Sequence, residues 1–331
     1  MTTQKTGHFL SCDWGSSSFR LRLVSTASGE VEAERRADCG CSVVAATEPS
    51  VEQREQAFES AFEQQLKHFL GDSPDPAIPV VLSGMVTSAH GWHELPYGRV
   101  PAGLDGAGLS TATYRLRDGR QATFVSGLRD ISDVMRGEEC ELLGLGATAG
   151  DREVALPDQA LVVMPGTHCK HVTIRNRIIT GFRTFITGEL YALLRHASVL
   201  RHSFAAEDEQ PAALDRAVLA EGARGVADNG LAAMLFQVRV GTLLRGSSAA
   251  TSEAFLNGIL VGAEFCGTGP TKDDIVVLLA ASERLQAIYQ TVATTLGFAD
   301  RFLVLPPAQV ADLAVKGHRT ILSRLDGRGD D

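Results

Sequence analysis

"FLSCDWGSSSFRLRLV", residues 9–24, predicts two strands joined by a bend that carries an unusual set of side chains. An apolar run ends at Asp13, a glycine and three serines follow, and apolar residues then recur at every second position. Backbone N–H groups at a glycine bend converge into a concavity that suits an anion. Because Asp13 repels a phosphate directly, it suits one only through Mg²⁺, which prefers carboxylates, waters and phosphate oxygens. The bend is therefore interpreted as half of a clamp for a magnesium-bound nucleotide, or else as an ordinary hairpin with Asp13 as a turn residue.

A matching pattern begins about half a chain later, in "ALVVMPGTHCKHVTI" at residues 160–174. Again a strand leads into a glycine bend and a second strand, and Gly166 stands where Gly15 stands in the first hairpin. A third strand and later a helix are expected after each hairpin, at 30–37 and 49–70 in the first half and at 177–182 and from 187 in the second. The sequence therefore predicts a duplicated α/β domain, with the two copies facing one another across a cleft.

The remaining elements set the expected domain boundaries. A buried strand at 79–86 follows the first long helix, and this strand–helix–strand order indicates a parallel pair in an α/β sheet. Residues 207–330 are expected to be mostly helical, apart from a buried strand at 273–280 and a helix that starts near Ser282. We expect an N-terminal domain at 1–150 and a C-terminal domain at 151–331, with the last helix as a candidate for return to the first domain.

Composition argues against several classes of function. The 331 residues carry a formal net charge of -9 with no cluster of lysine and arginine, which argues against nucleic acid as a partner. No run of about 18 apolar residues occurs, so no membrane span is predicted. No signal peptide is recognised, and the expected location is the cytoplasm. Six scattered cysteines are expected to be free thiols there. The one close pair, Cys39 and Cys41, has no further ligands that would complete a metal site.

Five blocks of the sequence are specific rather than generic. They are "DWGSSSFR" at 13–20, "GMVTSAHGWHELPY" at 84–97, "DVMRGEECELLG" at 133–144, "VMPGTHCKHV" at 163–172 and "FRTFITGELY" at 182–191. Through them nearly the whole chain resembles 2-dehydro-3-deoxygalactonokinases, members of the actin-like superfamily of sugar kinases, heat-shock ATPases and actin. The resemblance implies an α/β fold of two actin-like (ribonuclease H-like) domains around a nucleotide and substrate cleft, with ATP and Mg²⁺ as cofactors.

The resemblance assigns the two hairpins to the nucleotide. The first phosphate motif is Asp13 to Ser18, in which Gly15, Ser16, Ser17 and Ser18 contact the nucleotide and Asp13 holds the metal. The second is Pro165 to Lys170, with Gly166, Thr167, His168 and Lys170 as the contacts. His168 and Lys170 are candidates for contact with the transferred phosphate, although Lys170 is equally well explained as a solvated strand residue. Cys169 between them is expected to be buried and inert.

The general base is expected at the start of a helix. Phosphoryl transfer to a sugar hydroxyl needs in-line positioning, charge neutralisation and a group that accepts the hydroxyl proton. In related sugar kinases that base is an acid just after a glycine, shortly before the second hairpin, and in "RGEECELLG" the matching residue is Glu138, where relatives carry Asp. A helix start would keep it ionised. The alternative is that Glu138 and Glu139 only favour the helix N-terminus; Asp13 and then Asp133 are the next candidates.

A cation is expected to bind the carboxylate of the sugar acid. The planar fork of an arginine is the usual partner of a carboxylate, and Arg136 lies two residues before Glu138. The alternative is a surface arginine paired with Asp133 or Glu139. Arg20 and Arg99 are weaker candidates.

The block at 84–97 is expected to form the wall of the sugar-acid site. It follows the end of a strand, where binding loops lie in α/β sheets. Flat aromatic faces with nearby polar groups suit a sugar chain. The expected substrate residues are Gly84, Met85, Trp92 and Tyr97, and for Trp92 this interpretation is preferred to core packing.

One position departs from the family pattern. After the last buried strand, relatives carry a glycine against the adenine ring, followed at intervals of four by Leu and Tyr. This chain keeps Leu285 and Tyr289 but has Ala281 at the glycine position. Because glycine lets a backbone approach a flat ring more closely than a residue with a Cβ, we expect Ala281 to weaken ATP binding and purine discrimination.

These expectations describe an ATP-dependent kinase that phosphorylates 2-dehydro-3-deoxy-D-galactonate on its terminal (6-) hydroxyl, ahead of an aldolase in galactonate catabolism. The nearest alternative is a kinase for another 2-keto-3-deoxy acid or sugar, because epimeric acids differ at one hydroxyl. The alternative from another class is a nucleotide-binding regulator without catalysis, and the intact "RGEE" argues against it. The pattern does not indicate an oligomeric state.

Overall fold

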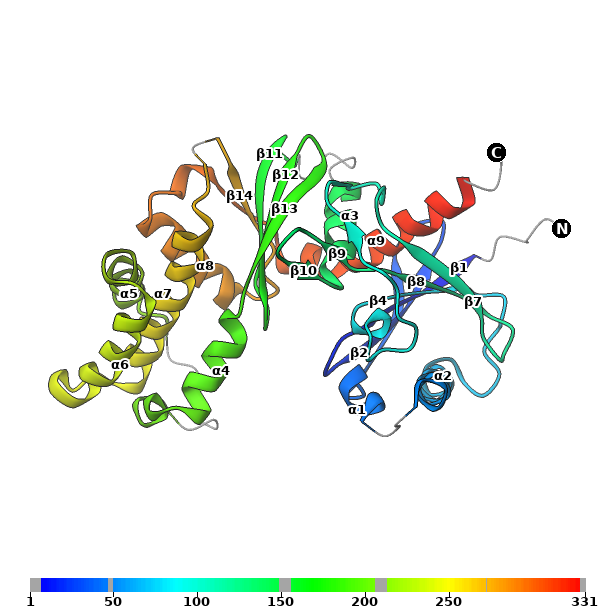
Figure 1. Cartoon of the computed structure of the whole chain (residues 1–331), viewed down its shortest axis with the longest axis horizontal. Coiled ribbons are helices and arrows are strands. Elements are labelled where there is room, and N and C mark those ends of the chain that lie inside the picture. The colour runs from blue at the N-terminus through cyan, green and yellow to red at the C-terminus, as the bar shows by residue number, and fades with distance from the viewer. Residues whose placement is uncertain (1–6, 47–49, 149–155, 206–212, 272, 328–331) are drawn as a thin grey trace. The chain divides into compact units, whose positions relative to one another are not determined.

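The structure is a computed structural model that describes residues 7–46, 50–148, 156–205, 213–271 and 273–327. The chain divides into two compact units. The first comprises residues 1–156, 177–180 and 312–331, and the second comprises 157–176 and 181–311. The boundary expected at residue 150 falls within 149–155, outside the described residues. Figure 1 shows both units and labels many of their helices and strands.

A six-stranded sheet lies at the centre of the first unit. It contains β1 (His8–Trp14), β2 (Phe19–Ser25), β3 (Val31–Ala37), β4 (Val80–Ser83), β7 (Thr111–Arg115) and β8 (Gln121–Val125) in the order β3-β2-β1-β4-β8-β7. The first three strands are antiparallel neighbours, whereas β4 runs parallel to both β1 and β8. The predicted parallel pair is therefore confirmed, and β4 is buried at every position.

Helices and short strands complete the first unit. They are α1 (Cys41–Ala45), α2 (Val51–Leu70), η1 (Met85–Thr87), α3 (Glu138–Thr148), β5 (Gly98–Arg99), β6 (Ala102–Gly103), β9 (Leu128–Arg129) and β10 (Val134–Met135), with most of α9 (Pro307–Gly327). Ser50 caps the start of α2. The Ser50 hydroxyl accepts from the Gln53 N–H (3.2 Å) and donates to the Gln53 side-chain oxygen (2.8 Å).

The sheet of the second unit repeats the first. It contains β11 (Gln159–Met164), β12 (Cys169–Arg175), β13 (Ile178–Phe185), β14 (Ile275–Leu278) and β15 (Phe302–Val304), with β11 between β12 and β14. β11 and β12 are antiparallel, and β14 runs parallel to β11 and β15. Each unit thus has an antiparallel hairpin and third strand followed by parallel strands on the other side of the first. This order confirms the predicted duplicated, actin-like α/β fold.

The helices of the second unit are α4 (Thr187–Ala197), η2 (Val199–Ser203), α5 (Arg216–Asn229), α6 (Leu231–Arg245), α7 (Ala249–Thr268), α8 (Glu283–Thr295) and η3 (Ala299–Arg301). Glycines let α5 and α7 approach closely, since a Cβ on Gly222 would lie 2.5 Å from the Phe255 carbonyl oxygen. Of the helices that the structure describes, none combines the length and apolar character that crossing a membrane requires.

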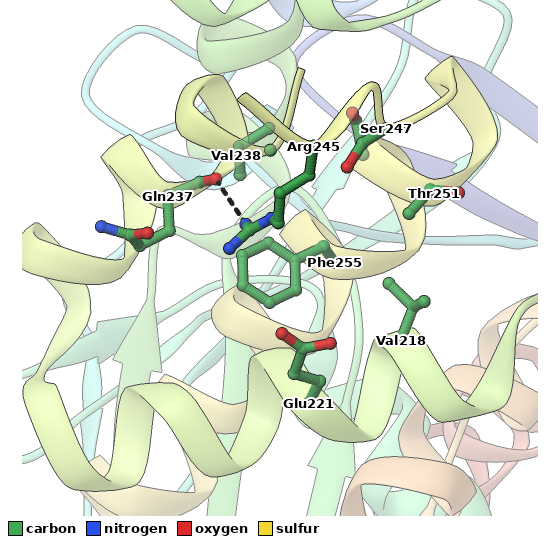
Figure 2. A pocket seen from close by; sticks show the side chains of 10 residues that line it. Val218, Glu221, Gln237, Val238, Arg245, Ser247, Thr251 and Phe255 are labelled. Carbon is green, nitrogen blue, oxygen red and sulfur yellow. Dashed lines mark hydrogen bonds between the residues drawn. The ribbon is translucent and has the colours of Figure 1, made fainter. Parts of the chain in front are cut away.

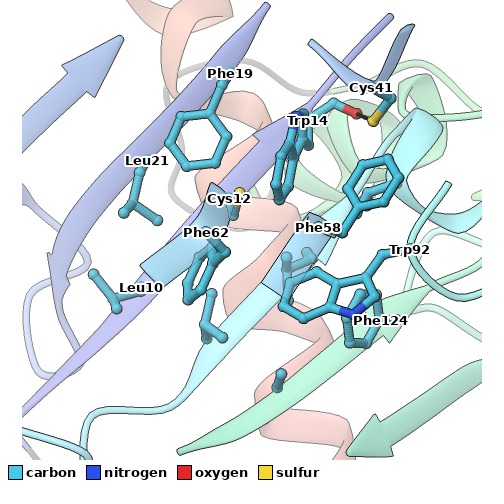
Figure 3. Packing of buried hydrophobic residues seen from close by; sticks show 14 of the residues in the cluster. Leu10, Cys12, Trp14, Phe19, Leu21, Cys41, Phe58, Phe62, Trp92 and Phe124 are labelled. Atoms are coloured by element: carbon cyan, nitrogen blue, oxygen red, sulfur yellow. Dashed lines mark hydrogen bonds between the residues drawn. The ribbon is translucent and has the colours of Figure 1, made fainter. Parts of the chain in front are cut away.

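Trp92 belongs to the core of the first unit. Its side chain is 3% exposed and packs among Trp14, Phe62 and Phe124, with the Phe124 ring centroid 5.3 Å away (Figure 3). The imidazole of His93 also stacks on it. Because neighbouring rings enclose the indole, it has no face to offer a sugar. The prediction that Trp92 forms a wall of the substrate site is therefore wrong.

Candidate active site

The first glycine bend is supported by the residues that open α1. The Gly15 N–H donates to the Ser18 carbonyl (3.0 Å), and amides at the start of α1 donate to the carbonyls of Gly15 and Ser16 (2.9 and 3.0 Å). Gly40 makes this contact possible, because a Cβ there would collide with the Ser16 carbonyl oxygen. The three serines at 16–18 remain exposed. The bend thus turns its carbonyls to α1 and leaves its hydroxyl-bearing residues accessible to a ligand.

The segment from Cys39 to Cys41 has a structural role. The Cys39 carbonyl accepts from the Trp14 indole N–H (2.8 Å), and burial raises the pKa of the Cys41 thiol. Within the described part of the chain, no group of three or more His, Cys, Asp or Glu side chains is arranged to hold a metal ion by itself.

Asp13, the penultimate residue of β1, lies beside the glycine that follows β4. In the sheet Asp13 pairs with Ser83, and Gly84 comes next with φ +92. A Cβ on Gly84 would lie 2.8 Å from the Trp14 carbonyl oxygen and 3.4 Å from the Asp13 carboxylate. Glycine is needed here both for its backbone conformation and for the space beside Asp13.

The start of α3 lies against the same glycine. A Cβ on Gly137 would come within 3.5 Å of the Gly84 Cα. Glu138 is the first residue of α3, and its Oε2 accepts from the Arg136 N–H (3.0 Å). Burial raises the pKa of Asp13, the charge of Glu138 raises it further, and Arg20 and Arg22 oppose the rise. The structure thus gathers Asp13, Gly84 and Glu138, three of the predicted site residues, from three separate elements.

Arg136 holds the loop that follows β4. One guanidinium nitrogen donates to the carbonyl and the hydroxyl of Thr87 (2.6 Å each), and the other donates to the Leu95 carbonyl (3.5 Å). The guanidinium carbon lies 4.1 Å from the ring centroid of Tyr97. Arg136 was expected either to bind the substrate carboxylate or to pair with Asp133 or Glu139 at the surface. Neither role describes this geometry, because the two terminal guanidinium nitrogens donate to the loop and Nε is buried. Arg136 and Tyr97 meet, but Arg136 does not present an open fork to a carboxylate.

Two further carboxyls lie at the start of α3. Glu139 is completely buried and accepts from the Gly137 N–H (2.7 Å). Burial, with help from the charge of Glu138, raises the pKa of Glu139 to about 8. Burial and the charges of Asp13 and Glu138 raise the pKa of Glu141 to about 8 as well. Both carboxyls are therefore mostly protonated near pH 7, and a cation bound nearby would favour their ionised forms.

Replacing Glu139 by Gln should flatten the dependence of stability on pH. Because folding raises the pKa of Glu139 to about 8, the folded state keeps a proton that the unfolded state releases above its ordinary value. This contribution to stability is fully present below pH about 4.5 and is lost as pH rises to about 8, by up to about 1.4 kcal/mol per pH unit. Gln keeps the acceptor for Gly137 and never ionises. Denaturant unfolding at pH 5.5 and 7.5 checks this, and an unchanged slope would contradict it.

The second glycine bend is supported in the same way as the first. The Thr167 carbonyl accepts from the Glu189 N–H of α4 (3.0 Å). A Cβ on Gly188 would collide with the Gly166 carbonyl oxygen and lie 2.8 Å from the Thr167 Cα. Gly188 therefore does for this bend what Gly40 does for the first.

The side chains around the second bend divide into exposed and buried groups. His168 is half exposed and lies 2.7 Å from the Glu189 carboxylate. Lys170 is only 4% exposed, and its ammonium donates to the His168 carbonyl (3.1 Å). The interpretation of Lys170 as a solvated strand residue is therefore wrong. Cys169 is buried as predicted, and burial raises the pKa of its thiol to about 11.

A cavity of about 340 Å³ opens next to this bend. Its lining comprises Pro165, Gly166, Thr167 and Cys169 from the hairpin, Thr187, Gly188 and Tyr191 from α4, Glu253, Asn257, Leu260 and Val261 from α7, and Ser282, Arg284, Leu285, Ile288 and Tyr289 at α8. The volume lies in the range of small-molecule sites, and an apolar wall with a few polar groups is typical of them. Leu285 and Tyr289 line the cavity, whereas Ala281 is exposed and is not among the lining residues. The cavity gives no support to a contact between Ala281 and adenine.

A buried acid holds Tyr289, one of the residues that line this cavity. Glu264 is 1% exposed, and both of its oxygens accept from the Tyr289 hydroxyl (3.0 Å each). Its Oε2 also lies 3.0 Å from the His171 ring nitrogen. The Tyr289 hydroxyl in turn lies 3.5 Å from the Cys169 sulfur. The glycine bend and α8 are thus joined beneath the cavity by one hydrogen-bonded chain.

A second hollow in this unit is too small for a nucleotide. It measures about 50 Å³ and lies among α5, α6 and α7. Figure 2 shows Arg245, Phe255 and Glu221 around it, with Arg245 donating to the Gln237 carbonyl (3.4 Å). A space of this size suits a few waters.

Comparison with known proteins identifies the family. The family model described as 2-keto-3-deoxy-galactonokinase matches residues 13–315. The chain belongs to this family. It is 34% identical over 305 residues to the "probable 2-dehydro-3-deoxygalactonokinase" of Rhizobium meliloti (strain 1021), covering 90% of this chain and 92% of the relative. It is 28% identical over 297 residues to the 2-dehydro-3-deoxygalactonokinase of Escherichia coli (strain K12), covering 88% and 91%.

A solved structure agrees with this assignment. The crystal structure of "a putative 2-dehydro-3-deoxygalactonokinase protein from Sinorhizobium meliloti" superposes with a TM-score of 0.77 at 28% identity. The match covers 95% of this chain and 99% of that chain. The 2-keto-3-deoxy-galactonokinase fold therefore extends over essentially the whole sequence.

Sequence reasoning missed the two supporting glycines of this 2-keto-3-deoxy-galactonokinase family member. Gly40 and Gly188 each come after the third strand of their unit, where a helix begins against the bend. Comparing the two halves of the sequence could have revealed them, because Gly40 and Gly188 occupy equivalent positions in the two units. The buried acids Glu139 and Glu264 gave no comparable signal.

Replacing Gly188 by Ala should raise the KM for ATP by roughly tenfold. The added methyl meets backbone atoms of the bend, and overpacking of this kind costs about 1–3 kcal/mol. Steady-state kinetics with varied ATP measure the change. Gly327→Ala is the control, because a Cβ at this other helical glycine meets nothing within 4 Å. An ATP KM within twofold of wild type in Gly188→Ala would show that the bend does not hold the nucleotide.

Proposed function

We propose that the protein transfers the γ-phosphoryl group of ATP to the terminal hydroxyl of 2-dehydro-3-deoxy-D-galactonate, as a cytoplasmic enzyme of sugar-acid catabolism. The observation that carries the proposal is the meeting of β1, β4 and α3, which gathers Asp13, Gly84 and Glu138. Both curated relatives are named for this sugar acid, which supports the choice of substrate. The cavity in the second unit has the size of a small-molecule site, which supports ATP as the phosphate donor.

Glu138 is the proposed general base. The carboxylate is oriented by the Arg136 N–H and lies at a helix N-terminus, where a negative charge is favourable. It takes the proton from the substrate hydroxyl as the hydroxyl oxygen bonds to the γ-phosphorus, and the bond from that phosphorus to the ADP oxygen breaks. The products are the phosphorylated acid and ADP.

Asp13 is the proposed protein ligand of Mg²⁺. The residues fit this ion, because Mg²⁺ usually takes one or two carboxylates and keeps waters and phosphate oxygens as its other ligands. Gly84 leaves space beside the Asp13 carboxylate, and Glu138 adds negative charge nearby. When bound, the ion neutralises charge on the phosphates. In the first unit, the exposed serines at 16–18 are the proposed donors to phosphate oxygens.

The sugar acid is proposed to bind beside Gly84, Met85 and Tyr97. Arg136 orders this loop through Thr87 and therefore acts on the substrate indirectly. Arg20 is the better candidate for the substrate carboxylate. It stands opposite Asp13 in the β1–β2 register, so the two side chains share one face of the sheet.

ADP release with a panel of acids tests the proposal. The panel is 2-dehydro-3-deoxy-D-galactonate, its gluconate epimer and galactonate itself, each with ATP and Mg²⁺. We expect the galactonate-derived keto acid to give the highest kcat/KM. A higher value for the epimer would reassign the substrate. No acid-dependent ADP release from a folded protein that binds ATP would contradict the kinase and favour a regulator.

A further inference from the structure

The C-terminal helix packs directly on the helix that carries the proposed base. A Cβ on Gly144 of α3 would collide with the Leu313 carbonyl oxygen of α9, and one on Gly317 of α9 would collide with the Cys140 carbonyl oxygen of α3. Glycines on both helices therefore bring the two backbones into contact. Cys140 lies in the first turn of α3, next to Glu138 and Glu139.

The residue after Gly317 joins α9 to two strands of the sheet. His318 is completely buried; its Nδ1 lies 2.8 Å from the Ser11 hydroxyl of β1 and its Nε2 lies 2.9 Å from the Ser83 hydroxyl of β4. Ser11 and Ser83 are themselves only 2% and 1% exposed. One imidazole thus uses both of its nitrogens to connect neighbouring parallel strands.

The two serines stand next to the residues of the proposed active site. Side chains alternate along a strand, so Ser11 and Asp13 lie on the same face of β1. Ser83 pairs with Asp13 across the sheet and immediately precedes Gly84. A shift of either strand at its serine would therefore move Asp13 or Gly84.

The imidazole is suited to a fixed connection rather than to proton transfer. Burial, helped by the charge of Arg22, lowers the pKa of His318 to about 3. The ring is therefore neutral near pH 7, with one nitrogen donating and the other accepting. A serine hydroxyl can do either, so both bonds are satisfied. The nearby core formed by β4, α3 and α9 is apolar, with Val81 packed against Cys140 and Ile321. A buried polar group here needs a reason beyond packing.

We propose that His318 is a positioning residue for phosphoryl transfer, which holds the ends of β1 and β4 in register with α3 so that Asp13 and Gly84 keep their places beside Glu138. The inference rests on the proposed function. It assigns a catalytic consequence to a residue far along the chain that contacts neither substrate nor metal. A positioning residue of this kind affects the chemical step, because small displacements of reacting groups lower the reaction rate even when the ligands still bind.

Replacing His318 by Leu should lower kcat by about 10- to 100-fold while the KM for ATP changes less than threefold. Leu fills the space but makes neither hydrogen bond. His318→Gln should retain more kcat than His318→Leu, because its amide nitrogen reaches about as far as Nε2 and keeps a donor for Ser83. Ser83→Ala should lower kcat as well, and combining it with His318→Leu should add little, since both changes break the same bond.

Val315→Ala is the matched control. Val315 is one turn earlier on α9, 1% exposed, and packs on Phe9 of β1 and Val24 of β2, and its apolar side chain can make no hydrogen bond to either serine. Both Val315→Ala and His318→Leu should lower the melting temperature, but Val315→Ala should leave kcat within twofold of wild type at a temperature where both variants are folded. If kcat falls equally in Val315→Ala, or stays at the wild-type value in His318→Leu, the role of His318 is only structural.

Amide hydrogen exchange supplies a readout that does not depend on turnover. In His318→Leu we expect exchange of the peptides covering 13–18 and 84–88 to rise about tenfold, and in Val315→Ala we expect no selective rise there. Unchanged exchange at both peptides would overturn the inference even if wild-type protein phosphorylated the sugar acid. A selective rise of exchange in His318→Leu, together with no activity of the wild-type protein on any acid of the panel, would support the positioning role of His318 and reject the proposed function.

Discussion

Glu138→Gln should reduce kcat at least about 100-fold while leaving the affinities for ATP and the sugar acid nearly intact. General bases typically contribute 10²–10⁴-fold, and Gln keeps the size of the side chain and the acceptor for the Arg136 N–H. Because the lost interaction exists only as the proton moves, kcat and kcat/KM should fall together. Steady-state kinetics with each substrate varied in turn measure this, with calorimetry for the binding of the sugar acid.

Asp133→Asn serves as the control and as the test of the rival base. Asp133 precedes the same helix, and its carboxylate accepts from the Val134 N–H (2.7 Å), a bond that the Asn oxygen can keep. We expect this variant to keep kcat within about threefold. A Glu138→Gln enzyme with more than a tenth of the wild-type kcat would rule Glu138 out. A large loss in Asp133→Asn would move the base to that residue.

The fold could be predicted because its signals are local. Alternating apolar residues and the two glycine bends each depend on neighbours in the chain, and both are confirmed. The duplication followed from comparing the halves. Gly84 and the start of α3 were also predictable, because family blocks carry the residues that must approach closely.

The errors concern side chains whose surroundings come from distant segments. Trp92 is enclosed by rings from β1, α2 and β8, and nothing in its own block predicts that enclosure. Arg136 was expected to pair with a neighbouring acid or a ligand, but it reaches Thr87, which is 49 positions away in the sequence. His318 contacts Ser11 across 307 positions. Such pairings are fixed by packing, and a single sequence carries little information on them.

Asp13→Asn should nearly abolish turnover with Mg·ATP and raise the Mg²⁺ concentration needed for half-maximal rate by at least about tenfold. Asn has the same shape as Asp13 but lacks the charge that Mg²⁺ prefers in a ligand. Loss of one charge-stabilising group at a reaction centre typically costs about 10²–10³-fold in kcat. Binding of the sugar acid, measured by calorimetry without nucleotide, should change much less. Unchanged turnover with an unchanged Mg²⁺ requirement would mean that the first bend is only a hairpin.

The same Asp13→Asn variant should be more stable than wild type at pH 7. Burial, with the charge of Glu138, raises the pKa of Asp13 above its ordinary value, so ionising it costs more in the folded chain than in the unfolded one. That cost is absent below the ordinary pKa and grows as pH rises from the ordinary pKa towards the raised pKa of the folded state, so it is present at pH 7. Asn removes it. Denaturant unfolding without Mg²⁺ should therefore give a higher midpoint for the variant at pH 7 and the same midpoint at pH 3. Excess Mg²⁺ should stabilise the wild type and leave the variant unaffected, because only an ionised Asp13 holds the ion. A lower midpoint for Asp13→Asn at pH 7 would show that the carboxylate stabilises the fold, and the loss of turnover could then be attributed to damage to the sheet rather than to the missing ligand.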